Sequence, residues 1–371
     1  MSKNYKKITF ICMNLGCGGT EKVVTNLAYY YSKKNISTSI ITLEAANTFS
    51  GFKISKKTEL VEFKKKYSSF IFSRFFKIIY LIYKLNKYMK KNKNSIYISF
   101  LTIPNIITII ASLNLKVINF GSERIDPRYA ELSLFWRTLR FIFYRRLKNL
   151  IVQTEEIKNY CKYFIPEKRI MIIPNSIDIS NLKSPPKILN NKKLRILFIG
   201  RIEYQKGIDI LLDAIIKISR GNKKKRYSFE IIGDGSLSYL VKKLIRENNL
   251  KGILKYSSKS NSPLSNIRRS NIVIHPSRYE GMSNVVLEAM SYGKCVISTD
   301  QSSSEIITNY KDGILMKNVS AVEIINCIEK VSMNRELLKD IGLNAISTIK
   351  NNYSEERIFK LWNKALKLIN E

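Results

Sequence analysis

Short apolar runs alternate with longer helical stretches along the whole chain. The runs are rich in β-branched side chains, a pattern that predicts buried strands. Alternation of strands and helices predicts parallel sheets with right-handed crossovers, so the expected fold class is α/β. The predicted strands are 7–13, 38–43, 95–101, 116–120 and 149–153, followed by 194–199, 228–232, 253–257, 271–275 and 294–298.

The predicted strands fall into two groups, and the stretch between them has the composition of a linker. Residues 176–193 contain two adjacent prolines and a polar run. A length of 371 residues also favours two domains. We expect Rossmann-like domains over 1–180 and 181–350, and a helix over 351–371 that packs back toward the N-terminal domain. Two such domains would face each other across a cleft, with ligands at the carboxyl ends of their strands.

The most informative stretch runs from residue 276 to residue 290. Glu280 follows a predicted strand, and Glu288 falls about a turn and a half into the next helix. Gly281 and Ser283 open that helix, whose free N–H groups and positive dipole end favour a phosphate. Carboxylates on both sides of an anion site suit a ligand with hydroxyls flanking a diphosphate, such as a nucleotide sugar. The alternative is an ordinary loop with two surface glutamates.

Two cations follow the first predicted strand of the C-terminal domain. Arg201 and Lys206 lie at the carboxyl end of the run 194–199. A guanidinium fork and an ammonium point charge are the usual protein groups for gripping a diphosphate. The alternative is that they are two surface cations of a very basic protein. The sequences around 233–235 and 310–313 are further signals that by themselves indicate only turns.

A glycine-rich loop follows the first predicted strand. It places Gly16, Gly18 and Gly19 before a helix predicted over 21–33. Glycines there let a ligand approach the backbone and the helix N-terminus. The spacing departs from the dinucleotide fingerprint GxGxxG, because Glu21 stands at the third glycine position. The loop is therefore a weak signal.

The composition disfavours several chemistries. The five cysteines form no CxxC pair, which favours a reduced compartment without disulfides or a zinc site. A Ser-His-Asp or Cys-His mechanism would have to use His275, the single histidine, and its place at the end of an apolar strand favours a structural role. No DxD triplet is present, which removes the commonest carboxylate pair for holding Mg²⁺.

The net charge is +35, and no Asp or Glu occurs from Phe63 to Ser122. Within this stretch, the segment 64–93 predicts an amphipathic helix that interleaves cations with aromatic residues. Its predicted apolar face holds Phe75, Ile78, Ile79, Ile82, Leu85 and Met89, and its polar face holds Arg74, Lys77, Lys84, Lys87 and Lys91.

Such a segment suits the headgroup layer of an anionic bilayer. A solvated basic face on a packed helix is an alternative, and nucleic acid is a less favoured one. No apolar stretch of the sequence is long enough to span a bilayer, and the N-terminus lacks the apolar core of a signal peptide.

Taken together, these motifs resemble glycosyltransferase family 4, whose members are retaining enzymes of the GT-B fold. The resemblance runs from about residue 8 to about residue 365. The two glutamates with their upstream cations carry it most specifically. The supporting blocks are Gly18-Gly19-Thr-Glu21, Pro174-Asn-Ser-Ile-Asp178, Gly200-Arg201 with Lys206-Gly207, and Gly233-Asp-Gly235.

The resemblance implies roles for individual residues. Arg201 and Lys206 would bind the donor diphosphate and stabilise its charge as it leaves, and Glu280 would contact the transferred sugar. Glu288 would bind the ribose hydroxyls. The resemblance implies neither a metal nor another cofactor, because the cations would do the work of Mg²⁺ on the diphosphate. The other donor-binding residues would be Gly18, Gly19, Gly281, Met282, Ser283 and Asn284.

The sequence departs from the family in two places. Ser176 stands where the midpoint motif commonly has glycine, and the N-terminal domain lacks the histidine that many members carry near the acceptor. Instead it has a Ser-Glu-Arg-x-Asp-Pro block, which is similar to a subgroup that assembles exopolysaccharide, capsule and lipopolysaccharide repeats. We place Ser122, Glu123 and Arg124 of this block at the cleft. The alternative is a structural Arg–Glu pair at a strand end.

The resulting hypothesis is a retaining hexosyltransferase. It would move a sugar of the galactose, N-acetylgalactosamine or glucose type from a UDP-sugar to a lipid-linked saccharide in surface polysaccharide synthesis. It would work in the cytoplasm, peripherally bound to the inner membrane face through segment 64–93. The alternatives are a sugar-nucleotide 2-epimerase of the same fold, whose side-chain bases the sequence does not reveal, and a basic nucleic-acid-binding α/β protein. No RRM, KH or helix-turn-helix pattern supports the last, so we expect no nucleic acid partner.

Overall fold

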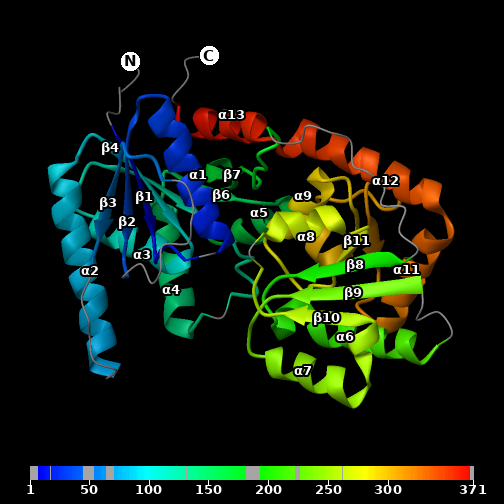
Figure 1. Ribbon diagram of the computed structural model, residues 1–371. Coiled ribbons are helices and arrows are strands. Elements are labelled where there is room, and N and C mark those ends of the chain that lie inside the picture. Colours follow the sequence, from blue (N-terminus) through cyan, green and yellow to red (C-terminus); the bar gives the residue numbers. More distant parts are fainter. Residues whose placement is uncertain are drawn as a thin grey trace. The chain divides into compact units, whose positions relative to one another are not determined.

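The computed structural model describes residues 7–16, 18–44, 54–63, 71–130, 132–180, 193–221, 226–260 and 262–367. The chain divides into two compact units (Figure 1). Unit 1 comprises Met1–Pro174 and Phe359–Glu371, and unit 2 comprises Asn175–Ile358. Residues 181–192 of the predicted linker and residues 64–70 of the predicted basic helix lie outside the described residues.

Unit 1 is built on a seven-stranded sheet in the order β3-β2-β1-β4-β5-β6-β7. All neighbouring strands pair in parallel. The chain runs from β1 to β3 on one side and then crosses to β4 on the other, so the topological switch point lies between β1 and β4. The strands are β1 (Lys7–Cys12), β2 (Ser37–Thr42), β3 (Thr58–Glu62), β4 (Ser95–Phe100), β5 (Ile118–Ser122), β6 (Asn149–Val152) and β7 (Ile170–Ile172).

Helices connect these strands. Helix α3 contacts both α2 and α4, and most of its residues are buried between them and the sheet. This position explains why α3 is almost uniformly apolar. The helices are α1 (Gly19–Lys33), α2 (Ile71–Lys91), α3 (Thr102–Ala111), α4 (Leu134–Phe143) and α5 (Glu155–Cys161), with the end of α13 (Glu355–Leu366).

The end of the chain returns to unit 1. Trp362 of α13 is 1% exposed, and its ring centroid lies 6.4 Å from that of Phe100. Phe359 stacks on Tyr30 of α1 with centroids 4.0 Å apart, and Asn363 Nδ2 donates to the Tyr30 hydroxyl at 2.9 Å. The last turns of α13 are therefore part of the core of unit 1.

Unit 2 is built on a six-stranded parallel sheet in the order β10-β9-β8-β11-β12-β13. Its switch point lies between β8 and β11. The strands are β8 (Leu194–Ile199), β9 (Tyr227–Ile232), β10 (Leu254–Ser257), β11 (Ile272–His275), β12 (Cys295–Thr299) and β13 (Ile314–Met316). The helices are α6 (Ile208–Arg220), α7 (Ser238–Glu247), α8 (Pro263–Arg269), α9 (Asn284–Ser291), α10 (Asp300–Ser303), α11 (Ala321–Met333) and α12 (Arg335–Thr348), with a π-helix at Ile349–Tyr353.

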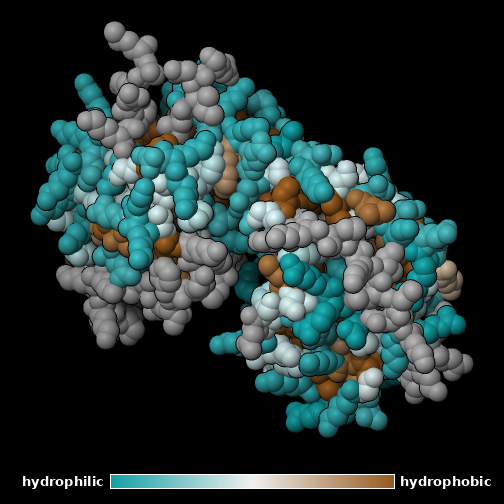
Figure 2. All heavy atoms as spheres, turned by 45° about the horizontal axis from the view of Figure 1, so that its top comes forward, coloured by the Kyte–Doolittle hydropathy of each residue, from teal (hydrophilic) through white to brown (hydrophobic). Residues whose placement is uncertain are grey.

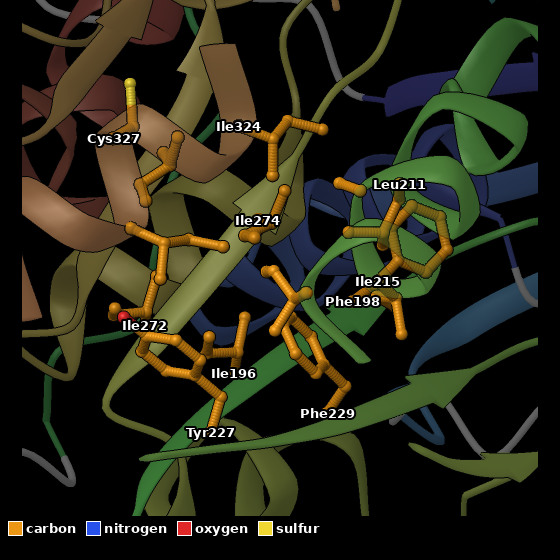
Figure 3. Packing of buried hydrophobic residues seen from close by; sticks show 14 of the residues in the cluster. Ile196, Phe198, Leu211, Ile215, Tyr227, Phe229, Ile272, Ile274, Ile324 and Cys327 are labelled. Carbon is orange, nitrogen blue, oxygen red and sulfur yellow. The ribbon is translucent and has the colours of Figure 1, made fainter. Parts of the chain in front are cut away.

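Strand β8 buries both of its faces. Ile196 and Phe198 belong to the cluster that includes Leu211 of α6 and Ile324 of α11 (Figure 3). Leu197 points to the other face and belongs to the cluster formed with α9. Burial on both faces is the reason why the strand has a continuous apolar run rather than an alternating pattern. The surface drawn in Figure 2 is mainly hydrophilic, with hydrophobic residues in small separate patches.

All ten predicted strands are found, but β3, β7 and β13 were not predicted. Each of the three lies at an edge of its sheet. An edge strand pairs on one side only and is less enclosed, so its sequence lacks a long apolar run. β3 reads TELVE, with Leu60 45% exposed, and β7 and β13 have three residues each. Among the described residues, no helix has both the length and the apolar character to cross a bilayer.

Candidate active site

The predicted donor residues of unit 2 lie where two neighbouring strands end. β8 leads into the loop that carries Arg201 and Lys206, and β11 leads into the loop that carries Glu280. β8 and β11 pair directly and flank the topological switch point. The two loops therefore leave the sheet side by side, at the edge where α/β folds bind ligands.

Lys206 and Glu280 form an ion pair between the two loops. Nζ of Lys206 donates to Oε1 of Glu280, and the two side chains are only 16% and 11% exposed. Lys206 ends a 3₁₀ turn, and Gly207 follows in the left-handed conformation at φ 65°. A Cβ at Gly207 would lie 2.1 Å from the carbonyl oxygen of Pro276. Glycine is therefore what lets the loops approach this closely.

The pKa of Glu280 lies well below its usual value. Burial by itself disfavours the carboxylate, but the charge of Lys206 and the hydrogen bonds of His275 and Lys206 outweigh it. Glu280 is therefore ionised and accepts hydrogen bonds only. A fixed carboxylate of this kind is suited to accept hydrogen bonds from sugar hydroxyls.

His275 contacts Glu280. The sequence predicted a structural role for His275 but did not indicate this partner. The ring is 3% exposed, and its Nε2 lies 3.4 Å from Oε1 of Glu280 and 2.9 Å from Oγ of Ser283. Ser298 donates to the His275 carbonyl at 3.0 Å. Burial lowers the pKa of His275 more than Glu280 raises it, so the neutral ring is favoured. Because ionised Glu280 only accepts, we assign the ring hydrogen to Nε2.

The helix after Glu280 begins where the sequence predicted. Ser283 is the N-cap of α9 and accepts a hydrogen bond from a backbone amide of the first turn. Asn175 secures the approach to this helix, because its Nδ2 donates to the Met282 carbonyl at 3.1 Å and to Oδ1 of Asn284 at 2.9 Å. The amides of the first turn and the positive dipole end offer a site for phosphate oxygens.

Arg201, Gly281 and Glu288 complete the predicted set in unit 2. Arg201 is exposed on the same loop as Lys206, and its guanidinium donates to Oε1 of Gln205 at 2.9 Å. Gly281 follows Glu280 directly, and Glu288 stands in the second turn of α9 with its side chain partly buried. All of these residues lie on the loops after β8 and β11 or on the helix between β11 and β12. Their individual roles in binding stay predictions.

Arg278 joins the two loops and was not predicted. Its guanidinium makes a bidentate ion pair with Asp209 at 2.7 and 2.9 Å, and it lies 3.7 Å from the ring centroid of Tyr204. Its backbone amide donates to the Gln205 carbonyl at 2.8 Å. These contacts hold the turn that ends at Lys206 against the loop that carries Glu280. No local sequence signal separates Arg278 from the other cations of so basic a chain.

The turn after β9 fixes the start of the Arg201 loop. The amide of Ile202 donates to the Asp234 carbonyl at 2.9 Å. A Cβ at Gly233 would lie 1.8 Å from the carbonyl oxygen of Gly200. Gly233 is therefore required for the close approach of two backbones and does more than form a turn.

The remaining donor candidates, Gly18 and Gly19, belong to unit 1. Gly18 is the N-cap of α1, and Gly19 is its first residue. Both are exposed at the carboxyl end of β1, beside the switch point of the unit 1 sheet. Exposed glycines at a helix N-terminus leave the backbone accessible to a ligand, and a role of Gly18 and Gly19 in donor binding stays a prediction.

Ser122, Glu123 and Arg124 are buried in unit 1, with 0%, 2% and 7% exposure. Glu123 accepts hydrogen bonds from Oγ1 of Thr102 at 2.8 Å and from the hydroxyl of Tyr144. Burial raises the pKa of Glu123 in spite of these two donors. The carboxyl is thus held by internal partners, and a role of this block in ligand binding stays a prediction.

Arg124 is held among aromatic rings. Its guanidinium carbon lies 5.8 Å from the ring centroid of Phe100 and 5.5 Å from that of Trp362, and NH1 donates to the Ile173 carbonyl at 3.3 Å. Burial lowers the pKa of Arg124 to about 9. The predicted motif therefore also secures the C-terminal helix to unit 1 through Trp362.

The chain is similar in sequence and in fold to known proteins. Residues 181–348 match the sequence profile of the family described as glycosyl transferases group 1. The protein is a glycosyltransferase. This glycosyltransferase is 25% identical to a GalNAc-alpha-(1->4)-GalNAc-alpha-(1->3)-diNAcBac-PP-undecaprenol alpha-1,4-N-acetyl-D-galactosaminyltransferase of Campylobacter jejuni, over 98% of each chain. It is 23% identical to the amylovoran biosynthesis glycosyltransferase AmsD of Erwinia amylovora, over 98% of its own length and 99% of that relative.

Solved structures share the fold of the glycosyltransferase at low identity. Anabaena HepE in complex with UDP matches with a TM-score of 0.81 and 16% identity, over 98% of this chain and 100% of that one. The lipopolysaccharide outer core galactosyltransferase WaaB in its apo form matches with a TM-score of 0.76 and 20% identity. The match covers 98% of this chain and 99% of that one. The predicted GT-B fold, with two parallel α/β units, is confirmed.

Proposed function

We propose that this glycosyltransferase moves a hexose or N-acetylhexosamine from a UDP-sugar to a lipid-linked saccharide, with retention of configuration. The sugar is of the galactose, N-acetylgalactosamine or glucose type, and the product enters a surface polysaccharide. The enzyme acts at the inner face of the cytoplasmic membrane. The observation that carries the proposal is the part-buried Lys206–Glu280 pair after the ends of β8 and β11, beside the N-terminus of α9.

The chemistry of unit 2 supports a diphosphate donor. Lys206 and Arg201 supply an ammonium and a guanidinium, and the first turn of α9 supplies backbone amides. These groups match the oxygens of a diphosphate. Crystals of the structural relative HepE hold UDP and UDP-glucose, which supports uridine as the nucleoside.

The sequence relatives support the acceptor class. The name of the Campylobacter jejuni relative describes a saccharide carried on undecaprenol diphosphate. The Erwinia amylovora relative is named for amylovoran biosynthesis. We extend a lipid-linked acceptor and a polysaccharide product from these proteins to this one.

In the proposed reaction, the bond between the anomeric carbon and the diphosphate oxygen breaks while the acceptor oxygen bonds to the same face of that carbon. The acceptor proton passes to the departing phosphate oxygen, so no side-chain base is needed. Lys206, Arg201 and the amides of α9 stabilise the negative charge that grows on the diphosphate. Glu280 holds the sugar through its hydroxyls, and Glu288 binds the ribose.

The proposed reaction needs no metal ion. The positive charge that a metal would give to the diphosphate comes instead from Lys206 and Arg201. We expect a chelator to leave turnover unchanged.

The test is a panel of UDP- and GDP-sugars incubated with the full chain, with donor hydrolysis followed by release of the nucleotide. We expect slow hydrolysis of at least one UDP-hexose or UDP-N-acetylhexosamine, and its loss in Glu280→Gln. No response to any UDP-sugar would refute the proposal. Formation of the 2-epimer without hydrolysis would favour the epimerase instead.

Replacement of His275 tests how Glu280 is positioned. His275→Phe keeps the ring volume but removes the Nε2 donor, so the carboxylate loses one of its supports. We expect kcat for donor turnover to fall by about 10²-fold, with a much smaller change in donor KM. His275→Gln can place an amide nitrogen near the position of Nε2 and should recover part of the loss. Equal activity of the Phe variant and the parent would show that the contact has no role.

A further inference from the structure

Helix α4 carries apolar side chains on two opposite sides. Its inner side packs on a buried cluster, with Trp136, Leu139 and Phe143 against it. Its outer side is exposed and also holds large apolar side chains, although the solvent-facing side of a surface helix is normally polar. The exposed apolar residues are Leu134 (77%), Phe135 (56%), Phe141 (52%) and Ile142 (54%).

The exposed side of α4 combines this apolar stripe with positive charge. The four residues share one side of the helix with Arg137, because successive residues advance by about 100°. No Asp or Glu occurs from residue 132 to residue 154. Arg145 lies 5.4 Å from the ring centroid of Phe141. The cations of this stretch are Arg137, Arg140, Arg145, Arg146 and Lys148, of which only Arg140 is buried.

Helix α2 carries a second stripe of the same kind, and here the sequence prediction was wrong in part. Leu85 and Met89 are buried as predicted, but Phe75 and Ile79 are exposed, and Leu81 takes their place in the core. The helix therefore has apolar residues on two sides. The exposed stripe holds Phe75 (60%), Phe76 (60%), Ile79 (47%) and Tyr83 (61%), next to the exposed cations Lys84, Lys87 and Lys90.

We propose that α4, together with the exposed stripe of α2, docks unit 1 on an anionic lipid bilayer. The two helices pack on the same helix, α3, so one layer of three helices carries both stripes. Apolar side chains would enter the boundary between headgroups and acyl chains, and the neighbouring cations would meet anionic headgroups. The inference rests on the proposed function for its lipid-linked acceptor, but it does not depend on which sugar moves.

Charge favours a bilayer over a second copy of the chain. A symmetric contact would place the cations of each stripe against those of its copy. The stretches that form the stripes contain no acidic residue to offset them, and the whole chain carries +35. Anionic headgroups remove this repulsion, whereas a second copy adds to it.

The place of α4 in the fold suits this role. α4 follows β5 through residues 123–133, so its first residues lie at the carboxyl edge of the unit 1 sheet. That edge is where parallel α/β sheets bind ligands. Docking through Leu134 and Phe135 would bring the ligand-binding edge of unit 1 to the surface that holds a lipid-linked acceptor.

A tryptophan placed on the exposed side of α4 gives the proposal a direct readout. The two native tryptophans lie elsewhere, because Trp136 packs on the inner side of α4 and Trp362 is buried in the core of unit 1. The experiment mixes the full chain and its Phe135→Trp variant with vesicles of phosphatidylcholine, with or without phosphatidylglycerol, and measures co-sedimentation and tryptophan emission. We expect both proteins to bind only when phosphatidylglycerol is present. The blue shift on binding should be larger for Phe135→Trp than for the parent.

A pair of matched variants distinguishes vesicle binding through α4 from nonspecific binding through other exposed apolar side chains. Phe135→Ser/Ile142→Ser removes two exposed side chains of α4, and Val322→Ser/Met333→Ser removes two from unit 2, where they are 57% and 69% exposed. We expect the α4 variant to bind phosphatidylglycerol vesicles at least about tenfold more weakly, and the unit 2 variant to bind like the parent. Both should keep donor hydrolysis, since neither touches the donor residues.

Four outcomes would overturn the proposal. They are no binding to phosphatidylglycerol vesicles, equal loss in both variants, a dimer that breaks in the α4 variant without vesicle binding, and retardation of DNA in place of vesicle binding. Donor hydrolysis decides the proposed function separately: vesicle binding without hydrolysis supports the α4 surface while refuting the transferase mechanism.

Discussion

Replacing Lys206 by methionine is expected to remove most donor turnover and to destabilise unit 2. The substitution removes the ammonium that the donor diphosphate needs, and it leaves the Glu280 carboxylate, which is only 11% exposed, without that counter-charge. Loss of one positioned charge-stabilising group lowers kcat by about 10²–10³-fold. Loss of one partner of a buried pair costs about 3–5 kcal/mol of unfolding free energy. Turnover assays and urea unfolding followed by circular dichroism measure the two effects.

The matched control is Lys217→Met, also in unit 2. Lys217 pairs with Asp213 at 2.8 Å, but both side chains are about half exposed, so its loss should cost less than about 1 kcal/mol and no activity. The double variant Lys206→Met/Glu280→Gln removes both charges of the pair. It should recover stability relative to Lys206→Met without recovering turnover. Unchanged activity of Lys206→Met would contradict the proposed donor site.

The pH dependence of the unfolding free energy provides an independent test of this prediction. In the parent, the pKa of Glu280 is depressed, so its stabilising effect is present above about 4.3 and is lost only as the pH falls through the folded value. In Lys206→Met, burial dominates and raises that pKa, so the variant loses stability as the pH rises. The difference in unfolding free energy between parent and variant should therefore be larger at pH 8 than at pH 5.

The second large effect is expected for Gly207→Ala. The residue adopts φ 65°, and a Cβ would lie 2.1 Å from the Pro276 carbonyl oxygen. A left-handed conformation costs a non-glycine residue about 1–2 kcal/mol, and overpacking against backbone adds about 1–3 kcal/mol. The loops after β8 and β11 would move apart and displace Lys206. We expect unit 2 to lose about 2–5 kcal/mol and turnover to fall by about 10²-fold.

Gly252→Ala is the control for that substitution. A Cβ at Gly252 would meet no atom within 4 Å, and its backbone is not left-handed. The unfolding free energy of Gly252→Ala should stay within about 0.5 kcal/mol of that of the parent, and the variant should keep full activity. If Gly207→Ala behaved like this control, close packing of the two loops would not be what holds Lys206 beside Glu280.

The position of the candidate site was predictable, but its supports were not. Glu280, Lys206 and the start of α9 follow strands that the sequence marks clearly, because parallel strands buried on both faces need continuous apolar runs. His275 ends a predicted strand and Asn175 belongs to a supporting motif, but nothing in the sequence indicated what they contact, and the Arg278–Asp209 pair was not indicated at all. Their partners come from other elements, and a single sequence gives no signal for contacts between distant elements. For Glu123 the opposite holds. The sequence singled out its motif but did not indicate that the side chain is buried.

By itself, the sequence determined that the chain forms two parallel sheets. It also determined which residues follow the strand ends, because a buried strand can be recognised from a local run of apolar residues. Only the tertiary structure decided which of many cations meets a carboxylate. Lys206 and Glu280 are 74 residues apart, and they meet because the crossover after β10 places β11 beside β8. Likewise, a helical pattern cannot say which of two apolar sides of α2 faces the protein. That choice belongs to the neighbouring elements, since they alone define where the interior lies.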